Sequence, residues 1–97
     1  METGPELDWD EAKRQATLAE RGLDFADVAL IDWEAALTME DLRKPYPEAR
    51  YITFATIRGR LCVVAWCWRE TALRVISLRK ANAREERRYA EAQALYR

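Results

Sequence analysis

Apolar and polar residues alternate with different periods in the two halves of the chain. In the first half, small apolar residues recur at helical spacing over residues 11–21, which predicts an α-helix. Asp10 is suited to cap the start of this helix, and Gly22 to end it in the left-handed conformation. Asp24 is placed to cap a second, short helix. That second helix would carry Phe25, Val28 and Ala29.

The second half of the chain contains runs of β-branched, aromatic and aliphatic residues that predict strands. Three strands are expected, over residues 50–58, 61–69 and 72–78. The turns between them, at Arg58-Gly59 and Glu70-Thr71, are so short that these strands must be antiparallel neighbours. The run 61–69 is apolar on both faces, which predicts the central strand.

Three further segments complete the predicted fold. Residues 7–9 have extended character, 35–39 suit a short edge strand, and 40–49 contain two prolines and form a loop. Asn82 followed by Glu85 resembles a capping box, which predicts a final helix to about Leu95. The expected fold class is α+β, with two N-terminal helices, an antiparallel sheet of three to four strands and a C-terminal helix. It forms one domain over residues 7–97, after a flexible tail over 1–6.

Composition excludes several functional classes. The chain of 97 residues has room for one domain and contains no histidine. Cys62 and Cys67 would lie about 17 Å apart on opposite faces of one strand, so they cannot form a disulfide, and the cytoplasm is the expected location. Two separated thiols without histidine leave zinc without a ligand set, and we expect no metal and no cofactor. The longest apolar run, 61–68, is too short to span a membrane.

Charge is distributed unevenly along the sequence. Residues 1–48 hold 13 acidic and 5 basic side chains, whereas residues 49–97 hold 4 acidic and 11 basic ones, although the whole chain has a net charge of −1. Such asymmetry is typical of a surface that binds a polyanion. The alternative is that the two halves simply pair their charges across the fold.

The stretch from residue 69 to residue 88 concentrates basic side chains. It contains Arg69, Arg74, Arg79, Lys80, Arg84, Arg87 and Arg88. Arginine matches phosphate geometry with two parallel hydrogen bonds, and a helix N-terminus attracts anions, so these residues are compatible with an RNA backbone as ligand. For the three arginines of the final helix, pairing with Glu85, Glu86 and Glu91 on a solvated face is the competing interpretation. Trp66 and Trp68, on one strand face, would either stack RNA bases or pack in the core.

The available side chains also limit the chemistry. Without histidine a catalytic triad is out of reach, and the sequence has no Walker loop, glycine-rich phosphate cradle or GxSxG motif. Cleavage of RNA without a metal is compatible with these residues, because the substrate supplies its own 2′-hydroxyl as nucleophile. The protein then needs a weak base, cations around the phosphate and correct positioning.

Several segments together resemble the BrnT-type toxins of bacterial toxin–antitoxin pairs. The resemblance covers residues 7–90 and rests on Leu7-Asp8-Trp9-Asp10-Glu11-Ala12-Lys13, Gly22-Leu23-Asp24-Phe25, Glu48-Ala49-Arg50-Tyr51, Arg69, Arg74-Val75-Ile76-Ser77-Leu78-Arg79-Lys80-Ala81 and Glu86-Arg87-Arg88-Tyr89. It implies a RelE-like fold and a metal-independent ribonuclease that inhibits translation. It also implies neutralisation by a BrnA-like ribbon-helix-helix antitoxin, through which the complex would bind operator DNA.

The resemblance also assigns roles to particular residues. It implies that Arg69, Arg74 and Arg79 bind phosphate and stabilise the transition state, and that Glu70 is the base or an orienting group. Additional RNA contacts would come from Lys80, Arg84, Arg87 and Arg88. The chain departs from the family pattern by carrying Thr17, Arg21, Ala55 and Trp68 in place of asparagine, histidine, glycine and an acid. Two alternatives therefore stay open: an inactive relative that binds the antitoxin as a co-repressor, and an unrelated RNA-binding module.

Overall fold

The computed structural model describes residues 4–95, which form five strands, two α-helices and one 3₁₀ helix. In chain order these are β1 (Leu7–Trp9), α1 (Glu11–Arg21), η1 (Phe25–Leu30), β2 (Leu37–Glu40), β3 (Arg50–Ile57), β4 (Arg60–Arg69), β5 (Ala72–Lys80) and α2 (Ala83–Leu95). Of the tail expected over residues 1–6, residues 1–3 lie outside the described part. No helix of the described part is long and apolar enough to cross a membrane.

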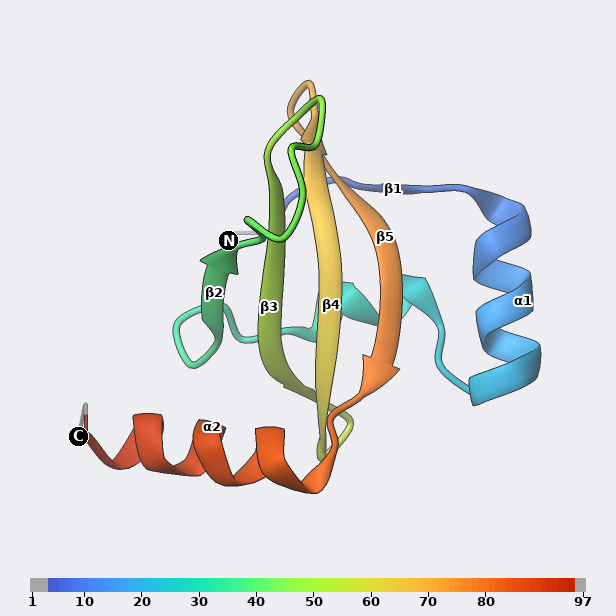
Figure 1. Cartoon of the computed structure of the whole chain (residues 1–97). Helices are drawn as coiled ribbons and strands as arrows, with labels where there is room; N and C mark the ends of the chain where they lie inside the picture. The colour runs from blue at the N-terminus through green and yellow to red at the C-terminus, as the bar shows by residue number, and fades with distance from the viewer. Residues whose placement is uncertain (1–3, 96–97) are drawn as a thin grey trace.

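The strands form one sheet in the order β1-β5-β4-β3-β2, so β4 is central as predicted (Figure 1). Neighbouring strands from β2 to β5 are antiparallel. Arg58 and Gly59 have φ angles of 51° and 78°, the left-handed values that a tight two-residue hairpin requires. The expectation of a purely antiparallel sheet of three to four strands is wrong, because β1 is a fifth strand and pairs with β5 in parallel.

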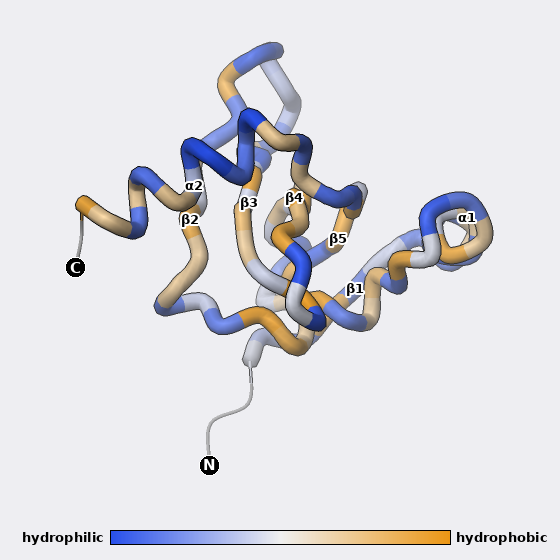
Figure 2. Tube along the Cα trace, turned by 90° about the horizontal axis from the view of Figure 1, so that it is seen from below, coloured by the Kyte–Doolittle hydropathy of each residue, from blue (hydrophilic) through white to orange (hydrophobic). Residues whose placement is uncertain are grey.

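The N-terminal helical region also differs from the prediction. The capping residues are confirmed, since the Asp10 side chain accepts a hydrogen bond from the Lys13 N–H and Gly22 has a φ of 69°. The second element, however, is a 3₁₀ helix, and α1 buries no residue. Instead of forming a compact hairpin with its neighbour, α1 stands beside the edge of the sheet (Figures 1 and 2). Its apolar positions are mostly alanines, which have little surface to bury.

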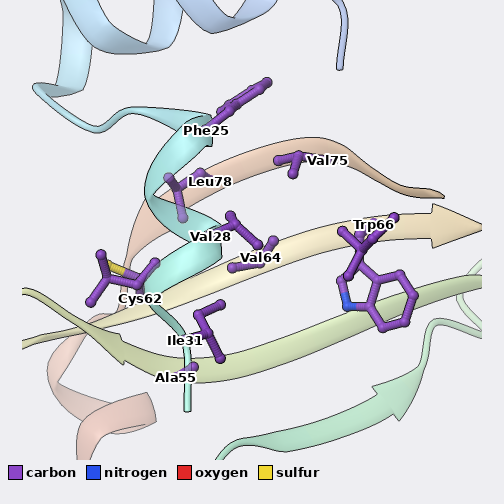
Figure 3. Packing of buried hydrophobic residues seen from close by; sticks show 11 residues of the cluster. Phe25, Val28, Ile31, Ala55, Cys62, Val64, Trp66, Val75 and Leu78 are labelled. Atoms are coloured by element: carbon purple, nitrogen blue, oxygen red, sulfur yellow. The ribbon is translucent and has the colours of Figure 1, made fainter. Parts of the chain in front are cut away.

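The main hydrophobic core lies between η1 and one face of the sheet, here called the η1 face (Figure 3). Phe25 and Val28 of η1 are 1% and 0% exposed. They pack against one face of the strands, including Ala55, Cys62, Val64, Trp66, Val75 and Leu78. Val75 and Leu78 share this face although they are three positions apart, because the pairing of β4 with β5 shifts register between Ala65 and Trp66. This single layer of contacts accounts for most of the apolar burial in the domain.

The opposite face of the sheet is covered mainly at one end, where α2 crosses it (Figure 1). A small cluster there joins Leu61, Val63 and Ala81 to Tyr89 of α2. The capping box is confirmed, because the Glu85 N–H donates to Asn82 Oδ1 at 2.8 Å and the Asn82 N–H donates to Glu85 Oε1 at 2.9 Å. The loop 41–49 stands near the other end, so the middle of this face lies between the loop and α2.

Candidate nucleic-acid site on the arginine face

The sheet face opposite η1 is called the arginine face here, because Arg50, Arg69, Arg74 and Arg79 all extend from it. A cleft of about 390 Å³ lies in the middle of this face. Its lining includes Ile52, Phe54, Val63, Ala65 and Ser77 of the strands, with Met39, Arg43, Arg79 and Glu85 around them. The cleft thus combines an apolar sheet surface with charged surroundings.

Strand register gathers three of these arginines at the end of the face away from α2. Arg50 of β3 and Arg74 of β5 both pair with Cys67 of β4, one from each side. Arg69 follows Cys67 by two positions and so extends from the same face. Three cationic side chains from three adjacent strands therefore surround one point of the sheet, which favours binding of an anion there.

Arg50 is the most unusual member of this group. Its Nε atom is buried and has no hydrogen-bond partner, and Arg50 forms no ion pair within residues 4–95. The guanidinium carbon lies 4.4 Å from the centre of the Tyr46 ring, which supports it from one side. A half-buried cation without a counter-ion is costly, so this group is ready to bind an anion.

Glu48 supplies a carboxylate at the same place, from the end of the loop 41–49. Its Oε1 atom lies 3.5 Å from Arg69 Nη2 and 3.6 Å from Cys67 Sγ. Burial of the Cys67 thiol and the nearby negative charge of Glu48 both raise the pKa of Cys67, which keeps the thiol protonated. A carboxylate that pairs with Arg69 at the arginine cluster is an arrangement that suits proton transfer next to a bound phosphate.

Arg74 is held in place by the parallel strand that the sequence analysis did not identify as a sheet partner. Arg74 Nη1 donates a hydrogen bond of 2.6 Å to Asp8 Oδ2 of β1. This bond, together with the opposite charges, lowers the pKa of Asp8 and raises the pKa of Arg74. One guanidinium nitrogen of Arg74 is thus occupied by Asp8, and the pairing fixes the direction of the side chain.

Arg79 lies at the other end of the face, near α2. It pairs across the strands with Val63, four positions from Cys67, or about 13 Å along β4. Its guanidinium donates two hydrogen bonds, of 2.8 and 2.9 Å, to the carboxylate of Glu85, and lowers the pKa of Glu85 to about 2. The structure therefore brings together Arg69 and Arg74, and separates Arg79 from them.

The remaining residues singled out in the sequence lie at the periphery. Glu70 is exposed in the β4–β5 turn with a φ of 58°, and Lys80 is exposed at the end of β5. On α2, the basic side chains of Arg84, Arg87 and Arg88 are all exposed. Among residues 4–95 none of these three pairs with a carboxylate, which is contrary to the competing interpretation, because Glu85 binds Arg79 and Glu86 lies 3.9 Å from Arg60.

The two tryptophans of β4 belong to the η1 face. Trp66 is 6% exposed, contacts the rings of Trp33 and Trp68 edge-on, and donates its Nε1–H to Thr53 at 2.8 Å. Core packing is thus confirmed for Trp66. Trp68 is half-exposed, but by strand alternation it extends away from Arg69 and the other arginines. An acid at position 68 would consequently lie on the wrong face to act beside Arg50 and Arg74.

Two other departures from the family pattern have structural explanations. The Arg21 Nη1–H donates to the carbonyl of Leu78 at 2.9 Å, which ties α1 to β5. Ala55 is 2% exposed in the core under η1. Neither residue contacts the arginine face.

Sequence reasoning missed Arg50 and Glu48 as site residues, and with them Asp8. All three precede the basic stretch 69–88 by many residues and reach the site only through strand pairing. One usable signal was present in β3, where Arg50, Ile52 and Phe54 occupy alternate positions and therefore share a face. The register that places this face beside Arg74 was not predictable from that pattern alone.

Comparisons with known proteins agree with the resemblance. A family model described as "Ribonuclease toxin, BrnT, of type II toxin-antitoxin system" matches residues 9–85. The crystal structure of the Brucella abortus ribonuclease toxin BrnT aligns with a TM-score of 0.62 and 30% sequence identity, and covers 81% of this chain and 99% of that one. A comparison with curated protein sequences gave no match.

Proposed function

Because the chain belongs to the BrnT family of type II toxin–antitoxin systems, we propose that it cleaves RNA without a metal ion and thereby inhibits translation. The observation that carries this proposal is Arg50, a half-buried cation for which residues 4–95 supply no counter-ion, aligned with Arg74 across Cys67. A phosphate of the RNA backbone would supply the anion. Arg69 would also contact this phosphate, because it lies two positions after Cys67 on β4 and extends from the same face.

The proposed reaction uses the 2′-hydroxyl of the substrate as nucleophile. This oxygen forms a bond to the adjacent phosphorus while its proton passes to the Glu48 carboxylate. The bond from phosphorus to the 5′ oxygen breaks, and the leaving oxygen takes a proton from water. The products are a 2′,3′-cyclic phosphate and a 5′-hydroxyl. Arg50, Arg69 and Arg74 stabilise the extra negative charge of the pentacoordinate phosphate.

We assign the base to Glu48 in preference to Glu70. Both carboxylates are exposed, but Glu48 lies 3.5 Å from Arg69 on the arginine face, whereas Glu70 lies in the β4–β5 turn and forms no ion pair within residues 4–95. Trp68 stands where the family pattern has an acid, but its side chain extends from the η1 face. Its presence would therefore leave the proposed base on the arginine face unaffected.

The basic residues near α2 would extend the RNA-binding surface. Arg79 lies beside the cleft, and the exposed cations Arg84, Arg87 and Arg88 lie on the helix that crosses this face. These arginines would hold the strand beyond the scissile phosphate. Lys80 pairs with Cys62 and so extends from the η1 face, which places it outside this surface. Each phosphate contact of this kind adds to the salt dependence of RNA binding.

Membership of a type II toxin family implies an antitoxin partner. We propose that this partner is a BrnA-like ribbon-helix-helix protein, that the complex binds operator DNA through the antitoxin, and that the toxin acts in the cytoplasm. Co-purification of this chain with the product of an adjacent short gene would test the first point, and a DNA shift assay with and without that product would test the second.

The test of the proposed activity is digestion of total RNA in the presence of EDTA by the purified chain. We expect cleavage by the parent, products that end in 2′,3′-cyclic phosphate, and strong loss of cleavage in Glu48→Gln and Arg74→Ala. Glu20→Gln is the matched control, because Glu20 is an exposed acid on α1. A folded parent that cleaves nothing, yet binds the antitoxin tightly, would favour the inactive co-repressor.

A further inference from the structure

The loop 41–49 is held in a defined shape by one buried carboxylate. Asp41 is 6% exposed and accepts hydrogen bonds from the Arg43 backbone N–H at 3.2 Å and from its guanidinium, with both contacts at 2.8 Å. The Tyr46 hydroxyl donates to the same carboxylate at 3.0 Å. The Asp41 N–H donates to the Arg50 carbonyl at 2.7 Å, which ties the start of the loop to β3.

The consequence of this bonding is a fixed aromatic ring beside the proposed phosphate site. The hydroxyl of Tyr46 is held by Asp41, and the ring lies against the guanidinium of Arg50 at 4.4 Å. A hollow of about 300 Å³ borders the ring, and its lining includes Pro45, Pro47, Glu48 and Arg50. This volume is ample for a nucleobase, and the hollow shares Glu48 and Arg50 with the phosphate site.

The positions of the other aromatic residues leave Tyr46 as the available stacking surface near Arg50. Trp66 and Trp68 lie on the η1 face. On the arginine face, Phe54 packs in the small cluster under α2, and the Tyr89 hydroxyl is bound to the Ala35 carbonyl at 2.7 Å, also at the α2 end. An RNA base next to a phosphate held by Arg50 would therefore meet Tyr46 first.

We propose that the loop 41–49 is a nucleobase subsite in which Tyr46 stacks against the base of a nucleotide adjacent to the phosphate held by Arg50. The proposal rests on the proposed function, since it takes that phosphate to belong to RNA. Single-stranded bases bind proteins by stacking on aromatic rings, and such stacking tolerates any base. The Glu48 carboxylate at the edge of the hollow would favour bases that present amino groups.

Binding can test the subsite without relying on cleavage. The probes are a short, fluorescently labelled single-stranded RNA blocked by 2′-O-methyl groups, and the same ribose–phosphate backbone without bases. We expect the parent to bind the RNA about tenfold more tightly than the base-free backbone, the effect of one stacked base. Tyr46→Ala should bring the ratio of the two affinities close to one. Loss of the ring beside Arg50 would weaken phosphate binding of both probes alike, so the ratio reports stacking.

Two further variants separate stacking from other effects. Tyr46→Trp should retain the preference, because it restores a larger aromatic face, whereas Tyr46→Leu should lose it while still filling the space. Trp68→Ala removes an exposed aromatic ring from the η1 face and should change nothing. Circular dichroism of each variant establishes that it is folded.

The outcomes distinguish the subsite from the proposed function. Equal binding of both probes by the parent would overturn the subsite and leave phosphate binding intact. Binding of neither probe would overturn the proposed function together with the subsite. A preference for the RNA that persists in both Tyr46→Ala and Tyr46→Leu would also overturn the subsite, because the base would then be recognised elsewhere.

Discussion

The two faces of one sheet carry opposite kinds of chemistry in this protein. On the η1 face, alternate residues of the three long strands are apolar and nearly all are buried under Phe25 and Val28. On the arginine face, the residues between them include four arginines and a cleft of about 390 Å³. Along each strand, the side chains on the η1 face build the core, and the side chains on the arginine face build the proposed site. A substitution should therefore affect mainly stability or mainly function, according to the face from which its side chain extends.

The largest expected effect is on stability, at the η1 face. Phe25→Ala removes a ring that is 1% exposed, and we expect the free energy of unfolding to fall by about 3–5 kcal/mol. Phe54→Ala, which removes the same ring from the partly open arginine face, should cost only about 1 kcal/mol. Urea denaturation of both variants measures the difference. Equal losses would contradict the division between the faces.

The next effect is on activity, at the arginine face. Arg50→Ala should lower RNA cleavage by about 10²-fold, as expected for one group that stabilises transition-state charge. Its free energy of unfolding should change by less than about 1 kcal/mol, because an unpaired half-buried charge is removed. Arg60→Ala is the matched control, since Arg60 is an exposed arginine at the start of β4. Similar losses of cleavage in the two variants would mean that only overall charge matters.

A smaller effect is expected where α2 joins the sheet. Asn82→Ala removes one half of the capping box, and we expect a loss of about 1 kcal/mol in the free energy of unfolding. Glu85 would still be able to bind Arg79, so RNA cleavage should change little. Thermal denaturation measured beside the cleavage rate checks both parts. A large loss of cleavage would place the helix start within the site.

The smallest effect is a pH dependence of stability at the same junction. The pKa of Glu85 is lowered from 4.5 to about 2 by Arg79, so the unfolded state binds the proton more readily. The stability from this pair is complete above pH 4.5 and is lost as the pH falls toward about 2. The stability advantage of the parent over Glu85→Gln should shrink across that window. When both proteins also carry Arg79→Ala, the stability difference between them should change less with pH. If it changes with pH as much as before, a group other than Arg79 lowers the pKa of Glu85.

Local signals predicted much of the fold. Asp10, Gly22 and the pair Asn82–Glu85 set helix ends through bonds within a few residues, and the Arg58-Gly59 turn fixes a hairpin by its own backbone. The parallel pairing of β1 was missed, because a strand of three residues has no readable period and its partner is remote. The 3₁₀ form of residues 25–30 depends on packing against the sheet, which no local pattern specifies.

The site was predictable only in part, for a related reason. Arg69, Arg74 and Arg79 stand in one basic stretch, so composition was enough to propose them as site residues. Their grouping could not, because it depends on register, which places Arg74 beside Cys67 and Arg79 opposite Val63. Arg50 and Glu48 reach the site from another strand and its loop. Long-range pairing thus determines both what was missed in the fold and what was missed in the site.

The parallel pairing of β1 with β5 has a consequence for the order of folding. Asp8 and Arg74 are 66 positions apart, whereas β3, β4 and β5 are linked by tight turns. During synthesis at roughly 5–20 residues per second, Asp8 would wait about 3–13 s for its partner. Local hairpins close first and distant contacts last. Arg74 can therefore be fixed in place only after β5 has joined the hairpins, so the arginine face is assembled late in the folding of this domain.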